Sequence, residues 1–250
     1  MVADSDATAH ISDEIPVSRI KPAYEQVADQ LRDLIVSGRL LPGDRLPVEA
    51  KLSGTFGVSR STVREALRSL TAQNLVYTSR GVTGGTFVAA TTPGLLSSHL
   101  ETGLSLLTGT DAITADELLE AREFFEVPAA RLAAQRRTQE HIDKMRVAIE
   151  RESRASGRGA KFERNTQFHT LVLSAAGNKL VEVMTVPIFG VIRSRFLRDD
   201  APRRFWSQVD DDHLAILGHI EAGAGDAAME AMRDHLARLR ETYQAGGREE

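Results

Sequence analysis

Apolar side chains recur at helical spacing through the first third of the chain. Between Pro22 and Ser37 they occupy positions 27, 31, 34 and 35, which predicts a first helix. A second, shorter helix is expected from Pro47 to Phe56, because proline suits the first turn of a helix. Gly57 can end this helix, and the Pro-Gly pair at 42–43 predicts a turn before it.

A third helix is predicted to begin after Ser59, whose hydroxyl can accept a hydrogen bond from a free backbone N–H in the first turn. Its apolar positions 63, 66, 67 and 70 share one arc, and the Arg and Ser residues at 60, 61, 64 and 68 share the neighbouring arc. One face can therefore pack while the next presents guanidinium and hydroxyl groups, as a DNA-recognition helix requires. Taken alone, this pattern fits an ordinary surface helix with solvated arginines equally well.

Two runs rich in β-branched and aromatic residues follow, at 75–79 and 86–89, and predict a hairpin. Its expected tip holds Arg80, which can enter a DNA minor groove or bind phosphate. Gly81 follows, and it has no side chain that would hold the tip away from a narrow minor groove. Three helices followed by a hairpin predict a winged helix-turn-helix domain over residues 19–90.

Beyond this domain, helical periodicity continues to the C-terminus without a strand pattern. Turn residues divide it into seven expected helices, at 95–107, 115–137, 139–153, 161–175, 180–196, 205–222 and 226–245. Pro128 falls inside the second of these and is able to kink it. We therefore expect an all-α helical bundle over 97–245, a linker at 91–96 and flexible ends at 1–18 and 246–250. The fold class is mainly α.

Composition narrows the class of protein. A length of 250 residues is enough for two domains, and the absence of cysteine excludes disulfides and thiolate metal sites. No run of about 18 apolar residues could span a bilayer, and residues 1–18 lack the apolar core of a secretion signal. We therefore expect a cytoplasmic protein without a membrane partner.

The charge is unevenly distributed along the chain. The formal net charge is −4, which by itself disfavours binding to DNA. Residues 39–85, however, carry seven Lys and Arg against three Asp and Glu, whereas residues 96–250 carry 21 against 25. A positive segment followed by an acidic one is consistent with DNA binding by the first domain and another role for the second.

Histidines are the candidate chemistry of the second domain. Asn165 and His169 are four residues apart and share a helix face. His213 and His235 lie on the last two expected helices, which a tight turn would make antiparallel. Three imidazoles around one cavity can bind zinc or another divalent transition metal. Spacing alone favours ordinary surface or core histidines over such a site.

Residues 23–90 resemble the DNA-binding domain of GntR-type bacterial transcription regulators. The resemblance rests on Gly38-Arg39-Leu40, on the segments 42–47 and 57–60, on 63–67 and on the glycine-rich wing. It implies that DNA is contacted by Ser59, Arg60, Ser61, Thr62, Arg64, Arg80 and Gly81, to which we add Arg45 and Arg68. Members usually carry Arg where this chain has Ala50, with Lys51 next, so one DNA contact is expected to be lost or shifted.

The second domain resembles the effector domain of the FadR subgroup of these regulators, notably over 120–122, 165–169, 213–217 and 232–236. Many members bind a divalent metal through three His and one Asp, and the His positions match His169, His213 and His235. The Asp position is Asn165, a neutral and weaker donor, so metal affinity should fall. A bound carboxylate, or an acid among residues 210–212, could supply the missing anion. The alternative is a metal-free polar pocket.

The resemblance also implies a ligand and a metal. Effectors in this subgroup are commonly small carboxylates, which a guanidinium can grip with two parallel hydrogen bonds. Arg122 matches an arginine of the family's pocket, and Arg195 is a second candidate. Zinc and nickel are the expected metals.

We therefore expect a ligand-responsive transcription repressor that binds operator DNA as a homodimer and is not an enzyme. Two alternatives remain open at this point. The helical domain could be a metal-dependent enzyme, because three histidines also leave an open position in catalytic zinc sites. The chain could also bind DNA without responding to any ligand.

Overall fold

The computed structural model describes residues 20–153, 158–196 and 203–246. It divides into two compact units, with the boundary between Thr91 and Thr92. The expected tail at 1–18 and residues 247–250 of the expected C-terminal tail lie outside the described residues, whereas residue 246 ends the last helix.

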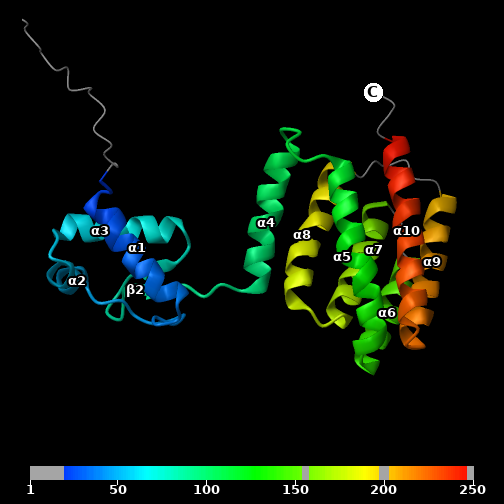
Figure 1. The fold of residues 1–250 in the computed structure, drawn as a ribbon, viewed down its shortest axis with the longest axis horizontal. Helices are drawn as coiled ribbons and strands as arrows, with labels where there is room; N and C mark the ends of the chain where they lie inside the picture. Colours follow the sequence, from blue (N-terminus) through cyan, green and yellow to red (C-terminus); the bar gives the residue numbers. More distant parts are fainter. Residues whose placement is uncertain (1–19, 154–157, 197–202, 247–250) are drawn as a thin grey trace, which may run out of the picture. The chain divides into compact units, whose positions relative to one another are not determined.

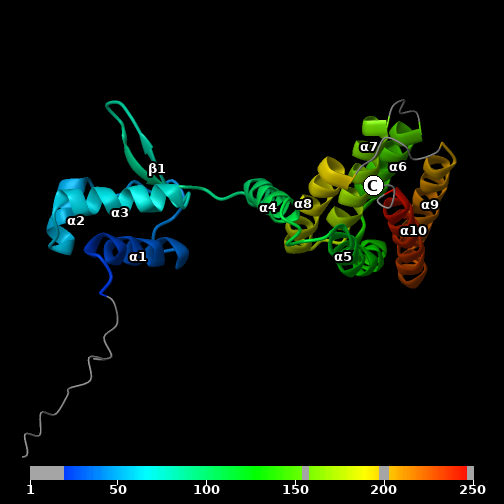
Figure 2. The same cartoon turned by 90° about the horizontal axis from the view of Figure 1, so that it is seen from above.

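The first unit consists of helices α1 (Ala23–Val36), α2 (Glu49–Phe56) and α3 (Arg60–Ala72), followed by strands β1 (Val76–Ser79) and β2 (Gly85–Val88). The strands are antiparallel, with Val76 opposite Val88 and Ser79 opposite Gly85. Figure 2 shows the hairpin standing out from the three helices as a wing. The predicted winged helix-turn-helix fold is confirmed.

Helix α3 forms where its sequence pattern placed it. The Ser59 hydroxyl accepts a hydrogen bond from the Thr62 backbone N–H at 3.1 Å and caps the helix. Gly57 ends α2 with a left-handed φ of 66°, a conformation that glycine adopts at no steric cost. The apolar arc Val63, Ala66, Leu67 and Leu70 is buried in the core of this unit.

The second unit is a bundle of roughly aligned helices (Figure 1). They are α4 (Pro93–Thr108), α5 (Ala115–Arg136), α6 (Gln139–Ser153), α7 (Arg158–Ala175), α8 (Lys179–Phe196), α9 (Arg203–Glu221) and α10 (Gly225–Gly246). Helix α4 begins inside the stretch 91–96 that was expected to be a linker, because Thr92 caps it and Pro93 suits its first turn.

Helix α5 is central to the bundle and packs against α7, α8, α9 and α10. It runs unbroken through Pro128, and its first turn is fixed by a capping box between Thr114 and Glu117. Apolar side chains from α5 to α10 form one continuous core. Among the described residues, no helix is long and apolar enough to span a membrane.

Candidate functional sites

The exposed side of α3 carries the residues that the sequence assigned to DNA. Arg60, Ser61, Arg64 and Arg68 are exposed, and Thr62 is half-buried. The Ser59 and Ser61 hydroxyls lie 2.7 Å apart, so the cap and the first turn present hydroxyl and guanidinium groups on one surface. Such groups can bind both phosphates and base edges.

Arg64 is held by a carboxylate on the neighbouring helix. Its Nη2 and Nε donate to the two carboxylate oxygens of Glu49 at 2.9 and 3.3 Å, a bidentate pair. The hydrogen bond from Arg64 lowers the pKa of Glu49. Glu49 therefore restricts the directions in which the Arg64 guanidinium can point. This contact between α2 and α3 was not foreseen from the sequence.

Arg45 lies against the wing. Its Nη2 donates to the backbone carbonyl of Gly84, and its guanidinium carbon lies 6.0 Å from the centre of the Phe87 ring. Gly84 itself has no room for a side chain, because a Cβ atom there would lie 2.6 Å from the Ser79 carbonyl oxygen. Arg80 and Gly81 are exposed at the tip, where Gly81 has a φ of 110°.

The bundle brings His169 of α7, His213 of α9 and His235 of α10 together in its interior. All three side chains are fully buried, and one nitrogen of each lies within 4.8 Å of the others. The Nε2 atoms of His169 and His235 are 3.2 Å apart. Asn165, one turn before His169, places its side-chain nitrogen 3.4 Å from Nε2 of His213. We call these four residues the histidine centre.

Each histidine turns its other ring nitrogen to a carboxylate. The Nδ1 atoms of His213 and His235 lie 2.9 Å from Glu152 Oε2 and 3.0 Å from Asp212 Oδ2. Glu126 Oε2 lies 2.5 Å from His169 Nδ1, although the angle departs from that of a good hydrogen bond. A carboxylate only accepts hydrogen bonds, so each Nδ1 carries the proton and each Nε2 lone pair faces inward.

Sequence reasoning missed Glu126 and Glu152. It considered Asp212 only as a direct metal ligand, whereas the structure places this carboxylate on the outer nitrogen of His235. Glu126 gave one signal, because it lies one helical turn after Arg122 and can pair with it. Glu152 gave none, because its partner His213 is 61 residues away in the chain.

The histidine centre is chemically suited to a cation. The Nε2 atoms of His169 and His235 are buried and face each other, and with both Nδ1 atoms protonated each presents a lone pair to the other. Burial lowers the pKa of His169 to about 4, against the opposing charge of Glu126. Burial also holds the pKa of His235 well below its ordinary value. A proton therefore does not fill the centre at neutral pH, and three imidazole nitrogens fit a divalent transition metal.

Two of the surrounding carboxylates, those of Glu126 and Asp212, stay charged at neutral pH. Burial alone would raise the pKa of Glu126, but the charges of Arg122 and His169 bring it down to about 2. Hydrogen bonds from His235, Gln208 and Arg238 likewise outweigh burial and lower the pKa of Asp212 to about 2. These two ionised carboxylates hold the tautomers of His169 and His235 over the whole physiological range.

Arg122 is linked to the histidine centre through Glu126. Its Nε donates to Glu126 Oε1 at 2.7 Å, and its guanidinium carbon lies 4.9 Å from the centre of the Phe189 ring. The side chain is only 2% exposed. Among the described residues, none accepts a hydrogen bond from its two terminal amino groups. The side chain of Arg195, the other expected effector residue, lies outside the described residues.

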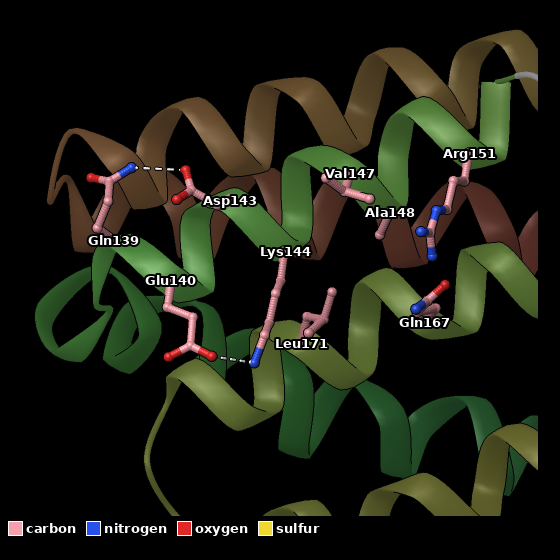
Figure 3. A pocket seen from close by; sticks show the side chains of 9 residues that line it. All are labelled: Gln139, Glu140, Asp143, Lys144, Val147, Ala148, Arg151, Gln167 and Leu171. Atoms are coloured by element: carbon pink, nitrogen blue, oxygen red, sulfur yellow. Dashed lines mark hydrogen bonds and ion pairs between the residues drawn. The ribbon is translucent and has the colours of Figure 1, made fainter.

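Two hollows on the described surface of the bundle differ in their relation to the candidate sites. One, of about 580 Å³, lies between α6 and α7, and the Glu140–Lys144 ion pair of α6 lines it (Figure 3). It contains none of the candidate site residues. A smaller hollow of about 330 Å³ lies between α9 and α10 and is lined by Asp212 and His235. The second hollow therefore reaches the outer side of the histidine centre.

Comparison with known proteins identifies the family of both units. The family described as bacterial regulatory proteins, gntR family, matches residues 23–88, and the FCD domain matches residues 117–238. The chain is 31% identical to the Uxu operon transcriptional regulator of Escherichia coli over 87% of this chain and 85% of that protein. It is 30% identical to the galactonate operon transcriptional repressor of Escherichia coli over 85% of this chain and 93% of that protein.

A solved structure, the GntR protein of Streptococcus agalactiae, is 27% identical and superposes with a TM-score of 0.63 over 88% of this chain and 99% of that chain. The matched family and relatives are transcription regulators, which argues against the alternative of a metal-dependent enzyme. The chain therefore belongs to the GntR family of bacterial transcription regulators, with an N-terminal winged helix-turn-helix domain and a C-terminal FCD domain.

Proposed function

We propose that this regulator is a repressor that releases or binds its operator in response to a small carboxylate held with a divalent metal in the FCD domain. The observation that carries the proposal is the convergence of three buried imidazole rings. One nitrogen of each ring faces the others, and the Nδ1 atom of each ring faces a carboxylate. Such outer-sphere carboxylates fix ring orientation and raise the basicity of metal ligands. Zinc and nickel are the metals that best match imidazole donors here.

The carboxylate is proposed to bind beside Arg122. The terminal amino groups of this buried arginine have no acceptor among the described residues, and a carboxylate would satisfy two of them at once. The relative named for the galactonate operon supports this chemical class, since galactonate is itself a carboxylate. Arg195 remains a second candidate for the same role.

The winged domain is proposed to bind the operator as one half of a homodimer, so that two copies read two half-sites of a pseudo-palindrome. The proposed contact residues are Arg45, Ser59, Arg60, Ser61, Thr62, Arg64, Arg68, Arg80 and Gly81. Arg45 would act partly by supporting the wing, because it bonds to the Gly84 carbonyl. Ligand and operator affinities must then be coupled reciprocally.

The test selects DNA from a random duplex library with the purified full chain and measures affinity for the selected site. We expect a two-fold symmetric site whose affinity changes when Zn²⁺ and L-lactate or D-galactonate are added together. Failure to select any DNA would contradict the regulator function. An unchanged affinity with every metal and carboxylate would leave a ligand-independent DNA-binding protein, the second alternative.

A further inference from the structure

The side of helix α6 that faces away from the bundle core is charged around one apolar side chain. Val147 lies at its centre, with 44% of its surface exposed. Residues three and four positions away on a helix share the face of the central residue. The side chains that surround Val147 in this way are all exposed, and they are Asp143, Lys144, Glu150 and Arg151. We call these five residues the α6 face.

The α6 face borders the larger hollow of the bundle, between α6 and α7. Val147, Ala148 and Leu171 give this hollow apolar surface, and Lys144 and Arg151 also line it (Figure 3). An apolar centre surrounded by charged side chains is the usual composition of a protein–protein contact. This surface is therefore a candidate docking site.

The charges of the α6 face are symmetric about Val147. Asp143 and Arg151 lie four residues before and after it and have opposite charges. Lys144 and Glu150 lie three residues before and after it and also have opposite charges. If two copies of α6 meet antiparallel with Val147 on the two-fold axis, each acid of one copy faces a base of the other. A parallel pairing in register would place like charges opposite each other, which is costly.

The ion pairs that these side chains form within their own copy do not prevent such a contact. Lys144 pairs with Glu140 at 2.6 Å, and Asp143 pairs with Arg146 at 3.5 Å, in both cases along the exposed side of α6. Exposed pairs of this kind contribute little free energy, so a new partner can replace or share them. Among the described residues, none forms an ion pair with Arg151.

We propose that the α6 face is a contact between two copies of this chain, with the two α6 helices antiparallel and Val147 at the two-fold axis. The contact is weak, because permanent dimer interfaces are larger and mostly apolar. It is also salt-dependent, because salt screens exposed charges. It therefore acts where copies are already held close together, as on neighbouring sites of one DNA molecule. It requires neither the metal nor the carboxylate of the proposed function.

Sedimentation equilibrium of the purified full chain, without DNA and with EDTA, measures this association. We expect the average mass of the wild type to rise with protein concentration in about 50 mM NaCl, and the association to be lost in about 500 mM NaCl. Asp143→Arg places a second arginine opposite Arg151 at two symmetric positions, so the association constant should fall by about tenfold or more. The formal net charge of −4 becomes less negative in this variant, so a general charge effect would act in the opposite direction.

The double variant Asp143→Arg with Arg151→Asp exchanges the two charges and restores their complementarity. We expect its association constant to return to within about threefold of the wild-type value. Glu230→Arg makes an equal change of charge on the exposed side of α10, outside the α6 face, and should associate as the wild type does. All three substituted positions are exposed, so the variants should fold normally.

Three results would overturn the inference. One is association of Asp143→Arg equal to that of the wild type, and another is a double variant that associates no better than Asp143→Arg. The third is a wild type whose mass changes neither with concentration at low salt nor with salt. None of these results concerns operator, metal or carboxylate binding, so each would leave the proposed function unaffected.

Discussion

The Nε2 atoms of His169 and His235 lie 3.2 Å apart in the interior of the FCD domain, each with its lone pair directed toward the other. Two acceptors at this distance repel unless a cation lies between them. The Nδ1 atoms of both rings face carboxylates, which prevents either ring from turning a proton inward. This pair is the strongest physical argument that the domain binds a metal.

Replacing His235 with alanine should abolish tight metal binding. The change removes one of three inward nitrogens, and we expect Zn²⁺ affinity to fall by more than about 100-fold, since even outer-sphere partners contribute about 10- to 100-fold. Equilibrium dialysis with elemental analysis measures it. His219→Ala, near the end of α9 and outside the centre, is the matched control. Equal zinc content in the two variants would contradict the metal site.

Glu152→Gln should weaken metal binding without removing a ligand. The amide can still face His213 Nδ1 but no longer stabilises its N–H as a charged acceptor, so Zn²⁺ affinity should fall about 10- to 100-fold. Isothermal titration with Zn²⁺ measures the change, and Glu150→Gln on the exposed side of α6 is the control. Wild-type zinc affinity in Glu152→Gln would show that the carboxylate is not an outer-sphere partner.

The metal-free protein should lose stability as the pH falls from about 6.5 to about 4. In this window the unfolded chain protonates its histidines, whereas burial keeps His169 neutral down to a pKa of about 4. The unfolded state therefore binds more protons, and stability rises with pH. Below this window stability falls further as the pH drops, because Glu126 and Asp212 have a pKa of about 2 in the folded protein, below the value of the same groups in the unfolded chain.

Thermal unfolding followed at several pH values measures this dependence. The variant His169→Gln should show a shallower fall in melting temperature between pH 6.5 and 4 than the wild type, because one buried neutral histidine has been removed. An identical pH dependence in the two proteins would mean that His169 is not held neutral by burial.

Arg64→Ala should weaken operator binding while leaving ligand binding in the FCD domain nearly intact. Loss of a bidentate arginine contact to a base costs about 1–3 kcal/mol, and loss of a phosphate contact would instead reduce the salt dependence. Fluorescence anisotropy with the selected operator distinguishes the two. Arg233→Ala, which removes an exposed arginine from α10, is the control. Unchanged operator affinity in Arg64→Ala would contradict the role assigned to α3.

Glu49→Gln tests whether the α2 carboxylate positions Arg64. The bidentate ion pair is exposed, so its loss should hardly affect stability. Discrimination between the selected operator and a single-base variant should fall by several-fold, because the guanidinium becomes free to adopt other orientations. An unchanged ratio of the two affinities would mean that the Glu49–Arg64 ion pair contributes to packing and does not orient Arg64 for DNA.

The sequence by itself determined the local structure of this protein. Helical periodicity, the Ser59 cap and the Gly57 end predicted α3 and its buried arc, because these features act between residues a few positions apart. The same is true of Asn165 and His169, which share a helix face by their spacing alone. The tight turn between the last two expected helices made His213 and His235 candidates for the same site, and the resemblance to a known family strengthened that interpretation.

Tertiary packing decided what those residues face. Glu126, Glu152 and Asp212 reach the histidines from other helices, and Glu49 and the wing engage Arg64 and Arg45 across element boundaries. Hydrogen bonds between side chains on different helices depend on how the helices pack, which local spacing does not encode. For that reason the sequence and the family resemblance named the residues of the histidine centre, but only the structure showed that every outer nitrogen meets a carboxylate.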